Sequence, residues 1–259
     1  MRAIAPDLLG AGDSEKPPGA ELHIRAQAGY VRELLDALGV REFAVVGHAI
    51  GGGIAQLLAL GGGVKAMVLM DSIAFDHWPS DPVRELMKQA PEQPTQAQVR
   101  AVMRTSFDLG MGRRSRLTDG NFEAYARSFE EDAGPAAFFR LVLAHDGLGL
   151  VGIESQLEGL ECPALLLWGE DDPFQSIEVA ERLAEALPMS TLAVLPGCSH
   201  FVTEDAPETA LPLVYQYLRS RYLGVDHDHD HGHDHGQEQG GLVRLDLLRR
   251  PPDEEEGRT

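Results

Sequence analysis

Residues 43–53 read Phe-Ala-Val-Val-Gly-His-Ala-Ile-Gly-Gly-Gly, and this stretch decides the fold. Its first half is apolar and β-branched, which predicts a buried strand, and the residues from Ile54 onward predict a helix. Glycines at 47 and 51 flank the centre of the turn, in the spacing of a sharp strand-to-helix corner. We expect a Cβ atom at either glycine to collide with the strand or the helix.

The residue at the centre of this corner is Ala49. An active enzyme places Ser, Asp or Cys there, because covalent catalysis needs an atom that attacks carbon. Two other glycine motifs do not fit, since neither the Gly-x-Gly-x-x-Gly spacing nor a Lys-Ser/Thr pair after the last glycine is present. We therefore expect no cofactor. A glycine-rich turn in some other α/β fold remains an alternative.

Further apolar runs predict strands at residues 65–70, 163–168 and 191–196, with a short one at 2–6. Helices are predicted at residues 30–38, at 177–187 with Ser176 as its cap, and from Pro207 onward, with a kink at Pro212. Strands that alternate with helices in this way predict an α/β fold, with a doubly wound, mostly parallel sheet covered on both faces.

The rhythm changes between residues 73 and 159, where helical patterns occur at 83–88, 96–107, 121–129 and 136–143. We predict that residues 1–72 and 160–223 form the core and that 73–159 form a helical cap or lid. A plain packing subdomain is the alternative. Residues 224–259 predict a disordered tail, because a polar low-complexity run cannot build a core. An isolated helical or extended segment around residues 242–248 is the only structure expected there.

The composition excludes several classes of partner. The formal charge of −19 argues against nucleic acid and against an anionic membrane surface. No apolar run is long enough to span a bilayer, and no signal region follows Met1, so a cytoplasmic location is expected. Cys162 and Cys198 are expected on opposite edges of the sheet, as free thiols.

Three positions follow the carboxyl ends of predicted strands: Ala49, Asp172 and His200. Catalytic groups of open parallel sheets gather at that edge, and the order nucleophile, acid, histidine is that of a hydrolase triad. A surface-turn aspartate and a structural histidine are the alternatives for the last two. Asp71, after the strand at 65–70, is a second-choice acid.

Four motif blocks, at residues 5–14, 47–52, 167–172 and 197–201, together resemble those of the α/β-hydrolase family. The resemblance extends from residue 1 to about residue 223, and the glycine triplet at 51–53 is similar to the epoxide hydrolase and haloalkane dehalogenase branch. It implies that Asp172 is the acid, that His200 is the general base, and that the N–H of Ile50 is an oxyanion donor. The implied reaction is hydrolysis of an ester, epoxide or carbon–halogen bond in a small organic molecule. Trp78 and Tyr125 are candidate substrate contacts, with core packing as the alternative.

Two departures from the family limit this interpretation. The nucleophile position is alanine, and the chain starts inside what resembles the family's fourth strand, without the His-Gly loop that donates the other oxyanion N–H. A mis-assigned start codon, a truncated duplicate and deliberate inactivation are all open explanations. An exposed sheet edge would favour a homodimer.

Three functional hypotheses follow. The first is a hydrolase homologue whose covalent chemistry is lost or impaired at Ala49. The second is a non-catalytic protein, a pseudoenzyme, that binds a small molecule. The third is a hydrolase in which Asp172 and His200 activate water without a covalent intermediate. No metal is expected in the folded domain, whereas the tail histidines predict weak, polydisperse binding of divalent metal. These are His227, His229, His231, His233 and His235.

Overall fold

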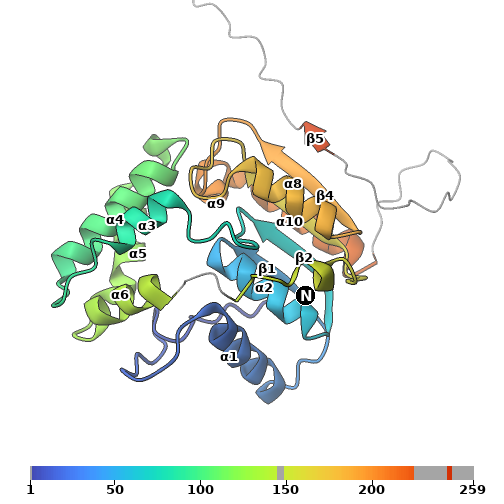
Figure 1. Ribbon diagram of the computed structural model, residues 1–259. Coiled ribbons are helices and arrows are strands. Elements are labelled where there is room, and N and C mark those ends of the chain that lie inside the picture. The colour runs from blue at the N-terminus through green and yellow to red at the C-terminus, as the bar shows by residue number, and fades with distance from the viewer. Residues whose placement is uncertain (1, 145–148, 225–243, 247–259) are drawn as a thin grey trace, which may run out of the picture.

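The computed structural model describes residues 2–144, 149–224 and 244–246. Five strands in these residues form one parallel sheet in the order β1-β2-β3-β4-β5, with helices on both faces (Figure 1). This arrangement confirms the predicted α/β class. The strands are β1 (Phe43–His48), β2 (Val64–Met70), β3 (Ala164–Gly169), β4 (Ser190–Leu195) and β5 (Arg244–Asp246).

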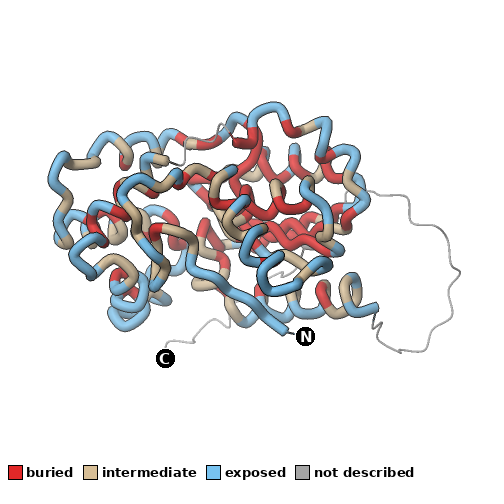
Figure 2. Tube along the Cα trace, turned by 90° about the horizontal axis from the view of Figure 1, so that it is seen from below, coloured by how far each residue is buried: buried red, intermediate tan, exposed pale blue. Residues whose placement is uncertain are grey.

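Residues 2–6 do not form the predicted strand. They are exposed and irregular, as the pale blue N-terminal segment in Figure 2 shows. Within the described chain, β1 pairs with β2 alone, so its outer side is an edge of the sheet and Val46 is 44% exposed. Apolar composition alone was misleading here, because a strand also needs a neighbour for its N–H and C=O groups.

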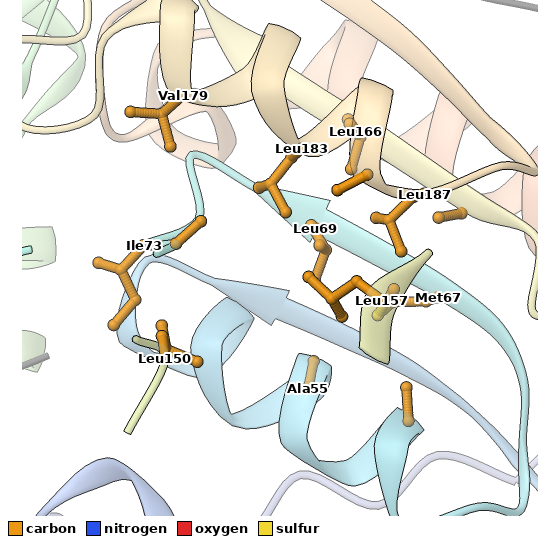
Figure 3. Packing of buried hydrophobic residues seen from close by; sticks show 14 of the residues in the cluster. Ala55, Met67, Leu69, Ile73, Leu150, Leu157, Leu166, Val179, Leu183 and Leu187 are labelled. Carbon is orange, nitrogen blue, oxygen red and sulfur yellow. The ribbon is translucent and has the colours of Figure 1, made fainter. Parts of the chain in front are cut away.

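Alternate residues of the central strands pack into two separate cores. Met67 and Leu69 lie with Leu166 on one face, against α2 (Ile50–Leu60) and α8 (Ile177–Ala186) (Figure 3). Val68 and Leu167 lie on the other face, against α10 (Pro207–Arg221). Strands that are buried on both faces are apolar throughout, which is why these runs were readable in the sequence.

Helix α1 (Ile24–Ala37) begins before the predicted residue 30. The Nδ1 atom of His23 accepts a hydrogen bond from the N–H of Ala26 at 3.2 Å and so caps the helix. The buried side chain of Gln27 then donates to the carbonyl of Leu9 at 2.8 Å. Ile24 and Ala28 of this first part pack in the main core, but the equally buried Gln27 is polar and interrupts the apolar pattern there.

The four helices predicted between residues 73 and 159 are confirmed as α3 (Asp81–Met87), α4 (Gln96–Gly110), α5 (Asp119–Ala126) and α6 (Gly134–Ala144). Short helical turns accompany them at η1 (Arg114–Arg116), η2 (Arg127–Phe129) and α7 (Glu154–Leu157). Leu86 and Val99 form a small core of their own with Phe139. We call residues 81–144 the helical insertion; it lies to one side of the sheet in Figure 1.

The last elements differ in detail from the prediction. Ser176 occupies the N-cap position of α8, but its side chain makes no capping hydrogen bond to the helix backbone. A short helix, α9 (Val202–Asp205), precedes α10, which begins at Pro207 as predicted. Pro212 lies inside α10, and its kink stays a prediction.

Residues 244–246 correct the predicted tail. They join the sheet as β5, parallel to β4, with Arg244 opposite Leu192. The outer edge of β4 offers backbone groups that need partners, and the backbone of residues 244–246 pairs with them. The five tail histidines lie outside the described residues, and so does their predicted metal binding.

Cys162 and Cys198 are buried free thiols, as predicted. None of the described helices combines the length and apolar character needed to cross a bilayer.

Candidate functional site

Ala49 occupies the corner between β1 and α2 with φ 50° and ψ −115°. Residues with a Cβ atom rarely adopt such angles, so the surrounding backbone must hold them. The N–H of Ala49 donates to the carbonyl of Met70 at 3.0 Å, and its own carbonyl accepts from the N–H of Ile73 at 3.2 Å. The corner is therefore a strained strand-to-helix turn of the kind that presents a reactive side chain, here with a methyl group.

The positions around the corner where a Cβ atom would collide differ in part from those expected. A Cβ on Gly47 would lie 2.2 Å from the carbonyl oxygen of Gly51, which confirms the expectation for Gly47. A Cβ on Gly51 would meet nothing within 4 Å, so the same expectation for Gly51 is wrong. The close approach occurs one residue later, where a Cβ on Gly52 would lie 2.1 Å from Oγ of Ser72.

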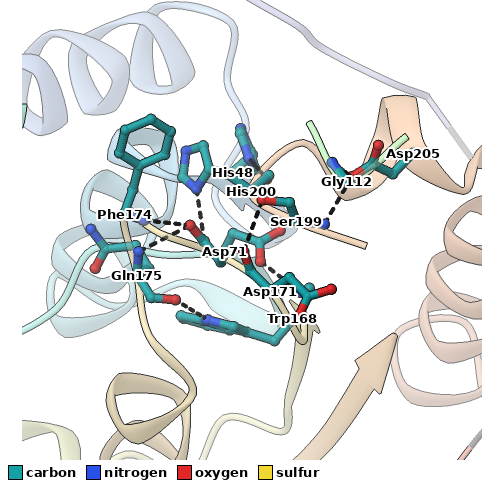
Figure 4. Close-up of polar contacts among 12 residues, drawn as sticks. His48, Asp71, Gly112, Trp168, Asp171, Phe174, Gln175, Ser199, His200 and Asp205 are labelled. Carbon is teal, nitrogen blue, oxygen red and sulfur yellow. Dashed lines mark hydrogen bonds and ion pairs between the residues drawn. The ribbon is translucent and has the colours of Figure 1, made fainter. Parts of the chain in front are cut away.

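Asp172 and His200 meet beyond the ends of β3 and β4. Nδ1 of His200 lies 2.8 Å from Oδ2 of Asp172, and both residues are buried (Figure 4). Since a carboxylate only accepts, Nδ1 carries the proton, and Nε2 is the free acceptor of the neutral ring. Oδ1 of Asp172 accepts the N–H groups of Phe174 and Gln175, at 2.7 and 3.1 Å. The carboxylate is thus fixed at both oxygens and orients the imidazole.

His48, the residue before Ala49, contacts His200 directly. Its Nε2 lies 2.7 Å from the carbonyl oxygen of His200, and the two ring centroids are 4.8 Å apart. Burial and the neighbouring His200 lower the pKa of His48 to about 4. His48 is therefore neutral near pH 7 and donates its Nε2 proton to that carbonyl.

Two phenylalanines enclose the His200 ring. Phe174 and Phe201 lie edge-on to it, with centroids 4.9 and 5.1 Å away. Edge-to-face packing restricts the rotation of the imidazole and excludes water from part of it. This enclosure has no periodic signal in the sequence, because the two rings come from different loops.

Asp71, the second-choice acid, makes a different contact. Its side chain is buried, and Oδ1 accepts the N–H of Gly169 at 2.8 Å. Burial, and then the nearby Asp172, raise the pKa of Asp71 well above its usual range. Asp172, and not Asp71, is therefore the carboxylate that bonds to the His200 ring, and Asp71 is a buried carboxyl next to this pair.

The other candidate residues lie around this centre. Ile50 is the first residue of α2, where a backbone N–H has no partner within the helix. Trp78 is buried in the main core cluster, which favours the packing alternative. Tyr125 lies on α5, and its hydroxyl donates to Glu204 at 2.8 Å. Groups of three His, Cys, Asp or Glu side chains arranged to hold a metal do not occur in the described residues.

Comparison with known proteins agrees with this geometry. A family model described as the alpha/beta hydrolase fold matches residues 1–207. Mouse epoxide hydrolase 4 is 27% identical over 84% of this chain, which spans 66% of that protein's length. Haloalkane dehalogenase 2 of Mycobacterium tuberculosis is 28% identical over 80% of the chain and 75% of its own length. A 2-hydroxymuconate semialdehyde hydrolase of Pseudomonas putida is 28% identical over 84% of the chain and 76% of its own.

Solved structures show the same fold. A meta-cleavage product hydrolase of Pseudomonas fluorescens superimposes with a TM-score of 0.70 at 20% identity, over 83% of this chain and 79% of its own. A thermophilic esterase of Thermogutta terrifontis gives a TM-score of 0.67 at 22% identity, over 83% and 78%. The chain belongs to the α/β-hydrolase family. Within it, the chain is related to epoxide hydrolases, haloalkane dehalogenases and meta-cleavage hydrolases.

Proposed function

We propose that this protein is an α/β-hydrolase homologue that binds a small organic molecule and has lost the covalent step of hydrolysis. One observation carries the proposal: Ala49 holds the strained corner, with φ 50°, but has no attacking atom. A methyl group forms no acyl or alkyl ester with a substrate. The reaction class, hydrolysis of ester, epoxide or carbon–halogen bonds, is proposed from the printed names of the relatives.

The preserved Asp172–His200 pair supports an origin in catalysis. An imidazole with a fixed tautomer and a free Nε2 acceptor is arranged to take a proton from a hydroxyl or from water. A purely structural histidine needs no buried carboxylate of its own. Ile50, next to Ala49 at the start of α2, has a backbone N–H without a helical partner, which suits a developing oxyanion.

Restoring the missing atom tests the proposal. Ala49→Asp should allow a carboxylate oxygen to attack an epoxide or haloalkane carbon, forming an alkyl ester as the ring opens or halide leaves. Ala49→Ser should favour esters instead. Combining Ala49→Asp with His200→Gln removes the base that directs water, so the ester should accumulate and increase the intact mass of the protein. The matched control is His200→Gln alone, which should show no added mass.

The same experiment separates the rival functions. Turnover by the wild type that disappears in His200→Gln, without any added mass, would establish direct activation of water. Ligand binding with no activity in either revertant would establish a binding protein that has moved away from catalysis. The expected result is negligible wild-type turnover and a gain in at least one revertant. The gain is limited if only one oxyanion donor is present, since losing one donor costs roughly 10²–10³ in rate.

A further inference from the structure

The end of α4 in the helical insertion packs directly against the loop that carries His200, residues 197–201. The N–H of Phe201 donates to the carbonyl of Gly110 at 3.3 Å. A Cβ on Gly110 would lie 2.7 Å from Cε2 of Phe174 and 2.7 Å from Cε2 of Phe201. Gly110 therefore fits between the two rings that enclose His200, with no space to spare.

One buried carboxylate joins the two segments. Oδ2 of Asp205 accepts the N–H of Gly112 at 2.9 Å and the N–H of Ser199 at 2.8 Å. Oδ1 accepts the N–H of Arg113 at 2.8 Å. Asp205 is completely buried. Three backbone N–H groups from the two segments thus share one buried acceptor, so the position of the insertion and that of the His200 loop depend on the same side chain.

The connection continues from Ser199 to the loop of the acid. Oγ of Ser199 donates to the carbonyl of Asp171 at 3.0 Å, and the N–H of Asp171 donates to the carbonyl of Cys198 at 3.0 Å. Ser199 precedes His200, and Asp171 precedes Asp172. The backbone segments that set the distance between imidazole and carboxylate are thus both attached, through Ser199, to Asp205.

We propose that Asp205 is a positioning residue that keeps His200 aligned with Asp172 only while the helical insertion is seated on the core. The inference rests on the site of the proposed function but does not depend on its chemistry. The hydrogen bonds from Gly112 and Arg113 to Asp205, and from Ser199 to Asp205, are the connection through which a movement of the insertion would change the position of His200.

A neighbouring acidic residue, Glu208, provides a matched control. The two terminal guanidinium nitrogens of Arg116 donate hydrogen bonds to the carboxylate of Glu208, at 2.7 and 3.1 Å, so Glu208 too joins the insertion to the stretch after His200. Its side chain is 52% exposed and also lies 3.7 Å from Nη1 of Arg113, but none of these hydrogen bonds or ion pairs involves residues 197–201. Glu208→Gln therefore weakens the attachment of the insertion at an exposed site without disturbing Ser199.

The test compares the full-length wild type with Asp205→Asn and Glu208→Gln by nuclear magnetic resonance. The amide introduced by Asp205→Asn has one acceptor oxygen and presents an NH2 group to at least one backbone donor. In this variant we expect the Nδ1 proton of His200 to broaden or disappear. We also expect the amides of Gly112, Arg113 and Ser199 to exchange about tenfold faster or more. Glu208→Gln should leave the Nδ1 signal of His200 and the exchange of the Ser199 amide unchanged, although it removes an ion pair of the Arg113 side chain.

Neither measurement requires turnover, so an inactive protein does not affect the result. If Asp205→Asn melts earlier but retains the wild-type Nδ1 signal and Ser199 exchange, the carboxylate only stabilises the fold and the proposal is wrong. If that variant does not fold, Gly112→Ala replaces it, because its methyl group would lie 3.1 Å from Oδ2 of Asp205 and 3.1 Å from the nitrogen of Ser199, and so disturbs the same bridge while the carboxylate is kept. An unchanged His200 signal in Gly112→Ala would also overturn the proposal.

Discussion

Asp71, which is buried, and His48, which is half-buried, are ionisable groups next to the Asp172–His200 pair, and the pKa shift of each favours its neutral form. The pKa of Asp71 is raised well above 3.8 by burial and by Asp172. The pKa of His48 is lowered from 6.5 to about 4 by burial and by His200.

The first prediction concerns Asp71. Above about pH 3.8 the unfolded chain releases this proton while the native state retains it, so the free energy of unfolding falls as pH rises. One proton changes it by at most about 1.4 kcal/mol per pH unit. Asp71→Asn keeps an acceptor for Gly169 and removes the titration. It should therefore become increasingly more stable than the wild type as pH rises from 4 to the native pKa of Asp71.

The measurement is urea denaturation of the wild type and of Asp71→Asn across this pH range. The difference between their free energies of unfolding is then plotted against pH. His48 acts in the opposite direction, because its contribution is present above pH 6.5 and is lost as pH falls toward 4. It is common to both proteins and cancels in the difference. A flat difference curve would show that Asp71 is ionised in the folded protein.

At the scale of elements, the corner between β1 and α2 depends on how closely two backbones approach. Gly47 faces the carbonyl of Gly51, and Gly52 faces Ser72 in the loop after β2. A side chain at either position must displace backbone or a buried neighbour. A Cβ atom at position 51 would lie in open space, so nothing in the structure requires glycine there.

The second prediction follows from this contrast. Gly47→Ala places a methyl group 2.2 Å from a backbone oxygen, so it should destabilise the protein by about 3 kcal/mol or more. Gly51→Ala, four residues later in α2, should stabilise it by up to about 1 kcal/mol through better helix propensity. Thermal and urea unfolding of the two variants check the pair. Equal destabilisation by both would contradict the predicted difference in space.

For the whole molecule, β1 forms one of the two outer edges that the sheet has among the described residues. The outer edge of β1 pairs with no other described strand, and Val46 is 44% exposed on it. Unpaired strand edges attract other strands, which natural sheets prevent with charge, proline or cover. A homodimer formed through this edge remains our proposal.

The third prediction is that the 259-residue chain self-associates through β1. Val46→Lys places a charge on the edge strand and should shift the chain toward monomer in light scattering after gel filtration. Val151→Lys, at a site that is 51% exposed and remote in sequence from β1, is the matched control and should leave the association unchanged. A wild type that is monomeric at high concentration would refute the prediction.

The sequence by itself determined the parallel α/β sheet, the four helices of the insertion and the strained corner at Ala49. Each depends on residues close together in the chain, where apolar periodicity and glycine spacing are direct signals. It also placed Asp172 and His200 at the same sheet edge, because parallel strands end together.

Only the tertiary structure decided that His200 pairs with Asp172 rather than Asp71, that residues 2–6 lack a strand partner, and that residues 244–246 have one. It alone showed His48 bonded to the His200 carbonyl, and Asp205 holding the segment at Gly112 together with the segment at Ser199. These contacts join residues that are distant in sequence. Their partners depend on how strands and loops approach in space, and local composition has no information about that approach.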